Sequence, residues 1–74
     1  MGKAYHSGTI VEWDWGKGKA FGEVMNAFTR EVQRQFNGSI VTRKASRDNP
    51  AYIIILKDGD RVLKLHSEIR RYDE

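Results

Sequence analysis

The chain has 74 residues, a formal net charge of +3 and no cysteine. This length allows one domain and excludes large catalytic folds with separate cofactor and substrate domains. The lack of cysteine excludes disulfides, thiolate zinc sites and cysteine nucleophiles. A hydrophobic content of 39% with a mean hydropathy of −0.66 is typical of a small soluble domain and not of a disordered tail.

Residues 1–7 are expected to form a flexible N-terminal arm that precedes a single domain over residues 8–72. The arm holds one lysine and no apolar run, so it does not resemble a signal peptide. The longest aliphatic run, Ile53 to Leu56, is far shorter than the roughly 20 residues of a membrane span. We therefore expect a cytoplasmic protein without a membrane partner.

Residues 8–13 are predicted to form the first strand. Val11 and Trp13 alternate onto one face, and Ile10 and Glu12 onto the other. Residues 14–19 then contain two glycines and are expected to form a loop that holds Trp15.

The segment from residue 21 to residue 36 fits two geometries. Its apolar residues follow a helical stripe, and Asn37-Gly38 could end that helix. The same dipeptide is also a strong hairpin signal, which would pair Val32 with Arg43 and Arg34 with Val41, with Glu31 opposite Lys44. The stripe consists of Phe21, Val24, Met25, Phe28, Val32 and Phe36.

The excess of positive charge over negative charge lies between residues 29 and 47. Five basic side chains stand there against the single acid Glu31, a net charge of +4, and the rest of the chain carries −1. Such a cluster suits an anionic partner such as nucleic acid, with Phe36 near enough to stack on a base. The alternative is a solvated hairpin whose charges only maintain solubility. The basic residues are Arg30, Arg34, Arg43, Lys44 and Arg47.

Residues 51–56 and 61–66 are predicted to form a second hairpin around Asp58-Gly59. A two-residue turn would place Tyr52 opposite Leu65, Ile54 opposite Leu63, Ile55 opposite Val62 and Ile53 opposite Lys64. Both faces are then apolar, and a homodimer contact through Ile53, Ile55 and Val62 is one way to cover the second face. Beyond it, residues 67–69 are expected to form one helical turn capped by Ser67, followed by a short tail over residues 70–72.

Taken together, these elements resemble the bacterial and fungal family known as the hypervirulence-associated protein TUDOR domain. The resemblance covers residues 8 to 72 and depends on the order of several short motifs. These are Gly8-x-x-Val11-x-Trp13, Gly22-x-Val24, Asn37-Gly38-Ser39-Ile40-Val41-Thr42-Arg43-Lys44-Ala45-Ser46, Asn49-Pro50-Ala51-Tyr52, Asp58-Gly59-Asp60-Arg61-Val62-Leu63-Lys64 and His66-Ser67-Glu68.

The resemblance implies an all-β fold: a small SH3-like, Tudor-type barrel of about five bent antiparallel strands with a short helical turn near the C-terminus. It favours strands over residues 21–28 and a hairpin over residues 32–42. It supplies no catalytic residues. It also implies that the first loop and the strand after Pro50 converge at one end of the barrel, where aromatic rings can hold a methylated cation.

No catalytic or metal-binding set is predicted. Gly16-Lys17-Gly18-Lys19 lacks the spacing of a phosphate-binding loop. His66, Ser67 and Glu68 are adjacent and cannot adopt the geometry of a hydrolase triad. Two histidines, His6 and His66, are too few and too unpatterned for a metal site, so we expect neither enzymatic activity nor a cofactor.

The sequence therefore predicts a non-catalytic binding module for a protein, a peptide or a second copy of itself. The candidate aromatic surface comprises Trp15, Phe21 and Tyr52; the alternative is that Trp13 and Tyr52 belong to the barrel core and Trp15 only shields it. The alternative function is nucleic-acid binding through the basic hairpin between Arg30 and Arg47.

Overall fold

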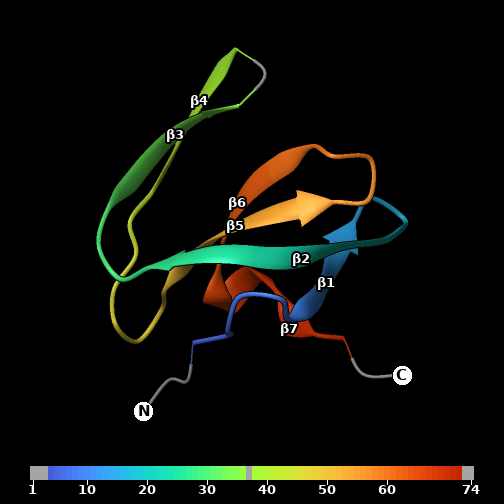
Figure 1. The fold of residues 1–74 in the computed structure, drawn as a ribbon, viewed down its shortest axis with the longest axis horizontal. Coiled ribbons are helices and arrows are strands. Elements are labelled where there is room, and N and C mark those ends of the chain that lie inside the picture. Colours follow the sequence, from blue (N-terminus) through green and yellow to red (C-terminus); the bar gives the residue numbers. More distant parts are fainter. Residues whose placement is uncertain (1–3, 37, 73–74) are drawn as a thin grey trace.

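A computed structural model describes residues 4–36 and 38–72, which form seven strands and one 3-10 turn. The all-β expectation is confirmed (Figure 1). The strands are β1 (Ile10–Trp15), β2 (Gly18–Phe28), β3 (Val32–Phe36), β4 (Ser39–Arg43), β5 (Ala51–Leu56), β6 (Arg61–Leu65) and β7 (Arg70–Arg71), and the 3-10 turn η1 spans His66–Glu68.

Five of these strands form the expected barrel-like sheet, in the order β6-β5-β2-β1-β7, with every pair antiparallel. Strand β2 is long enough to pair with β1 along its first half and with β5 along its second half. The ladder with β5 shifts at Met25, an extra residue that bends β2. Gly22 lies where the two halves meet, and a Cβ there would overlap the Ile54 side chain and lie 2.9 Å from the carbonyl oxygen of Ile55.

The segment that fitted two geometries is extended. A helix would bury its whole apolar stripe on one side, but Phe21 and Met25 are 44% and 39% exposed while Val24 is buried. Val32 pairs with Arg43 and Arg34 pairs with Val41, as the hairpin alternative predicted. The turn between β3 and β4 includes Asn37, which lies outside the described residues.

The hairpin β3–β4 is a separate two-stranded sheet inserted between β2 and β5. Figure 1 shows it standing away from one end of β2, while the β1–β2 turn lies at the other end. The resemblance implied a barrel of about five strands with this hairpin among them, whereas the main sheet has five strands without it.

Two details of the predicted loops are wrong. Strand β1 continues to Trp15, which pairs with Gly18, so the first connection is only the Gly16-Lys17 turn. Gly16 has a φ of +56°, a left-handed conformation that makes this tight turn possible without a six-residue loop.

The register of β5 and β6 is also displaced by one residue from the prediction. Ile53 pairs with Leu63, and Ile54 pairs with Val62. The cause is a longer connection, in which the N–H of Gly59 donates to the carbonyl oxygen of Leu56 and Gly59 takes a φ of +96°. A turn followed by a left-handed glycine makes a three-residue loop, and this moves every partner along β6 by one position.

The two faces of the β5–β6 ribbon are covered by different parts of the chain. One face packs inside the curled sheet, in a core built from Val11, Trp13, Val24, Tyr52, Ile54 and Ile69. The other face packs under the β3–β4 hairpin, in a second core around Val32, Ala51 and Leu63. The chain thus covers much of both apolar faces itself.

The C-terminal turn and tail also differ from the prediction. The turn is η1, and its first residue is His66, so Ser67 lies within the turn and does not cap it. The Glu68 carboxylate instead accepts a hydrogen bond from the N–H of Leu65 at 2.8 Å. The expected tail contains β7, which pairs with β1 at Val11 and Glu12.

Candidate binding surfaces

An apolar groove opens at the end of the sheet interior, between β1 and β6. Its volume is about 330 Å³, and we call it the Trp groove. Trp13 is buried in its wall, whereas Trp15, two residues further along the same face of β1, is 71% exposed. The lining residues are Trp13, Trp15, Ala20, Leu56, Val62 and Lys64.

Lys64 is the charged residue that lines the Trp groove. Its Nζ atom lies 5.7 Å from the centroid of the Trp13 ring, within the range of a cation–π contact. The face of Trp13 is therefore already occupied by a cation of the chain itself. A second cation in this groove would be repelled, whereas an acidic group would be attracted.

The structure does not bring the three predicted aromatic residues together. Trp15 lines the Trp groove, but Phe21 pairs with Glu12 and so lies on the opposite face of the sheet. Tyr52 is completely buried in the first core, inside the curled sheet. These three rings cannot form one cage.

Tyr52 is instead the centre of a hydrogen-bond network that ties three segments together. The N–H of Tyr5 donates to the Tyr52 hydroxyl oxygen at 3.0 Å, and the hydroxyl lies 2.8 Å from Nδ1 of His66. The hydroxyl oxygen accepts from the N–H of Tyr5, and toward His66 it donates to an unprotonated Nδ1 or accepts from a protonated one, according to the tautomer of the ring. The Tyr5 ring stacks on His66 with centroids 4.7 Å apart. Burial raises the pKa of the Tyr52 hydroxyl above its ordinary value of 10.0.

Sequence reasoning missed this network. Tyr5 belongs to the segment expected to be a flexible arm, and its partner Tyr52 is 47 residues away. No local pattern in the sequence indicates such a contact.

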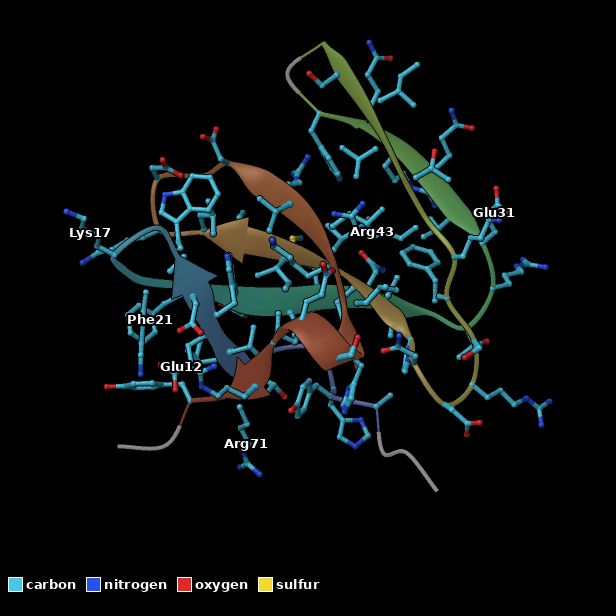
Figure 2. The ribbon with its side chains drawn as sticks, turned by 180° about the vertical axis from the view of Figure 1, so that it is seen from behind. Glu12, Lys17, Phe21, Glu31, Arg43 and Arg71 are labelled. Carbon is cyan, nitrogen blue, oxygen red and sulfur yellow. The ribbon has the colours of Figure 1, made fainter. Side chains whose placement is uncertain are left out.

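A second groove lies on the outer face of the sheet, where the β3–β4 hairpin does not reach. Its volume is about 430 Å³, and we call it the outer groove. Beside it, the Phe21 and Tyr72 rings meet edge to face with centroids 5.0 Å apart. Figure 2 shows Phe21 on the β1–β2 side of the molecule, near Glu12. The lining residues are Ile10, Phe21, Gly22, Glu23, Ile55, Leu56, Lys57 and Gly59.

Next to the outer groove, charged residues on β1, β2 and β7 compensate one another. Arg70 contacts Glu12 at 3.3 Å and Asp14 at 3.2 Å, and Lys19 contacts Glu12 at 3.8 Å. The hydrogen bond to Asp14 raises the pKa of the Arg70 guanidinium. Alternation along β1 already indicated that Ile10 and Glu12 share an outward face, but their partners required the strand order.

The predicted nucleic-acid residues do not share one face either. Arg34 and Arg43 lie on the face of the hairpin that turns toward the main sheet: Arg34 stands over the Phe28 ring at 5.0 Å, and Arg43 lies 3.6 Å from Glu68. Figure 2 shows Arg43 directed from β4 toward the main sheet, well apart from Glu31. Phe36 is half-buried against the second core.

The remaining basic residues, Arg30, Lys44 and Arg47, are exposed in the connections on either side of the hairpin. The outward face of the hairpin carries no charge and consists of Gln33, Gln35, Ile40 and Thr42. The excess of positive charge is thus a property of the segment and not of one surface.

The three residues predicted for self-association are also separated. Ile53 packs in the second core under the hairpin, and Val62 packs against the first core and lines the Trp groove. Ile55 alone of the three lines the outer groove.

Across residues 4–36 and 38–72, no group of three or more histidine, aspartate or glutamate side chains could hold a metal ion. Among the same residues, no helix is long and apolar enough to cross a membrane.

A curled five-stranded sheet with a 3-10 turn before its last strand, and with an apolar groove at its open end, defines a small Tudor-type domain. The chain belongs to the family described as the hypervirulence associated proteins TUDOR domain, whose model matches residues 8–69. Comparison with curated proteins and with solved structures gave no significant match. Tudor-type domains are in general small binding modules, which is the broad class of this chain.

Proposed function

We propose that this domain binds a segment of another protein by inserting an apolar side chain of that segment into the Trp groove. The observation that carries the proposal is the 71% exposure of Trp15 beside an apolar groove. Tryptophan is enriched among the residues that dominate binding energy, because it buries a large apolar area with little loss of side-chain freedom.

The charge of the groove favours a particular flanking chemistry. Lys64 places a positive charge beside the Trp13 ring. An aspartate or glutamate next to the inserted side chain would meet this ammonium, whereas a lysine or arginine would be repelled. The ligand class that we infer is a peptide with an apolar residue beside an acidic one.

A selection from a displayed random-peptide library tests this proposal. We expect the wild-type domain to enrich peptides that carry a large apolar residue next to aspartate or glutamate. The Trp15→Ala variant should bind the enriched peptides at least about 30-fold more weakly, which corresponds to about 2 kcal/mol for a dominant interface residue. Lys17→Ala, in the adjacent turn, is the matched control and should bind normally.

The two outcomes that contradict the proposal are clear. Either no peptide is enriched, or the enriched peptides bind the Trp15→Ala variant as tightly as they bind the wild type. A blue shift of tryptophan emission on binding gives an independent readout, because Trp15 is exposed while Trp13 is already buried.

A further inference from the structure

The outer groove combines apolar and charged residues in a pattern that the Trp groove lacks. Phe21 is 44% exposed, and Ile55 is half-buried. Glu23 and Lys57 are both exposed in the same groove. The ion pairs among the described residues involve neither Glu23 nor Lys57.

The strand register places these four side chains at the corners of a rough square. Glu23 pairs with Ile55, and Gly22 pairs with Leu56, so Lys57 follows beside Phe21. Residues two apart on a strand share a face, so Glu23 and Phe21 on β2 lie on the same face as Ile55 on β5. Lys57, the first residue beyond β5, lines the same groove. One diagonal of the square joins the two opposite charges, and the other joins the two apolar side chains.

This arrangement is complementary to itself. When two sheets pack face to face, a two-fold axis that runs in the interface along the Phe21–Ile55 diagonal exchanges the other two corners. Each apolar residue then meets its own copy, and each glutamate meets a lysine. The neighbouring charges on Glu12, Asp14, Lys19 and Arg70 are already compensated within one chain, so they add little repulsion at the edge.

We propose that the domain forms a two-fold symmetric dimer through its outer groove, with a second copy of this chain as the occupant. Phe21 and Ile55 of the two copies pack at the axis, and Glu23 forms an ion pair with the partner subunit's Lys57. The interface belongs to the weak, concentration-dependent class because the patch is small. It lies on the face opposite the Trp groove, so a dimer would present two Trp grooves.

Charge exchange at the two corners tests the proposal sharply. Sedimentation equilibrium from micromolar to millimolar concentration should show the wild-type mass rising from 8.6 kDa toward twice this value. Glu23→Lys and Lys57→Glu each place like charges together twice in the dimer and should weaken association by at least tenfold. The double variant Glu23→Lys/Lys57→Glu restores opposite charges and should recover most of the wild-type association.

Three results would overturn the proposal: a wild-type protein that stays monomeric throughout, single variants that associate as strongly as the wild type, or a double variant that fails to recover. Far-ultraviolet circular dichroism of each variant checks that the fold is retained, which is expected because both residues are exposed. Lys17→Glu, outside the groove, is the matched control and should associate normally. Peptide binding in the Trp groove is measured separately, so failure of either proposal leaves the other testable.

Discussion

The Tyr52 hydroxyl should contribute measurably to stability because it satisfies two polar groups at once. Tyr52→Phe keeps the ring in the first core but leaves the N–H of Tyr5 and Nδ1 of His66 without this partner. An unsatisfied buried polar group costs about 1 to 3 kcal/mol. We therefore expect a loss of about 2 kcal/mol from a total stability on the order of 4 to 11 kcal/mol for a chain of this size.

Urea and thermal unfolding measure this loss. A loss of about 2 kcal/mol should lower Tm by roughly 8 to 16 °C in a domain of this length. Tyr72→Phe is the matched control, because Tyr72 is partly exposed and its hydroxyl has no hydrogen bond among the described residues. A Tyr52→Phe variant within about 0.5 kcal/mol of the wild type would refute the reasoning, since that is the scatter of neutral substitutions.

The same hydroxyl should make stability depend on alkaline pH. Burial raises the pKa of Tyr52 in the folded state, so the unfolded chain releases this proton first as the pH rises. The stabilisation that comes from keeping the Tyr52 hydroxyl protonated is therefore fully present below the ordinary tyrosine pKa of 10.0. It is lost as the pH rises through the higher pKa of the folded state. The wild type should lose more stability than Tyr52→Phe above pH 10.0, and equal slopes would contradict the assignment.

Three further predictions follow from the packing and the charges. Gly22→Ala should lower stability by about 1 to 3 kcal/mol in urea unfolding, because its methyl group would overlap Ile54, whereas Gly18→Ala meets nothing within 4 Å and should be tolerated. Glu12→Gln should lower the urea midpoint by removing the contacts with Arg70 and Lys19, and this difference should shrink in molar salt; an undiminished difference would exclude an electrostatic cause. A random single-stranded oligonucleotide should bind only weakly and lose its affinity between about 50 and 200 mM salt, since the basic segment presents no common face; tight binding at the higher salt would contradict this interpretation.

Local turn chemistry explains which registers the sequence could predict. The β3–β4 register followed correctly from a two-residue connection. The same reasoning failed for β5 and β6, because Gly59 accepts a left-handed conformation equally well in a two-residue or a three-residue loop. The sequence shows that a glycine turns the chain there, but it does not show how many residues the turn contains.

The prediction of the aromatic surface depended on turn length and on contacts between residues that are far apart in the sequence. Whether Trp15 and Phe21 share a face is decided by the length of the first connection, and a two-residue turn at Gly16-Lys17 puts them on opposite faces. The burial of Tyr52 depends on Tyr5 and His66, which are remote in sequence. Hydrophobic alternation along β1 was sufficient to place Val11 and Trp13 on one face, because that pattern is local, and both side chains are buried.

The pairing of β7 with β1 joins residues that are 58 positions apart at Arg70 and Glu12. During translation, the β7 side of β1 therefore has no native partner until Arg70 and Arg71 have left the ribosome. The earlier hairpins can form locally within microseconds, but the pairing of β7 with β1 forms only after the other strands have been synthesised. A released chain that is truncated after Ile69 should thus be cleaved by proteases near its beginning more readily than the full-length chain.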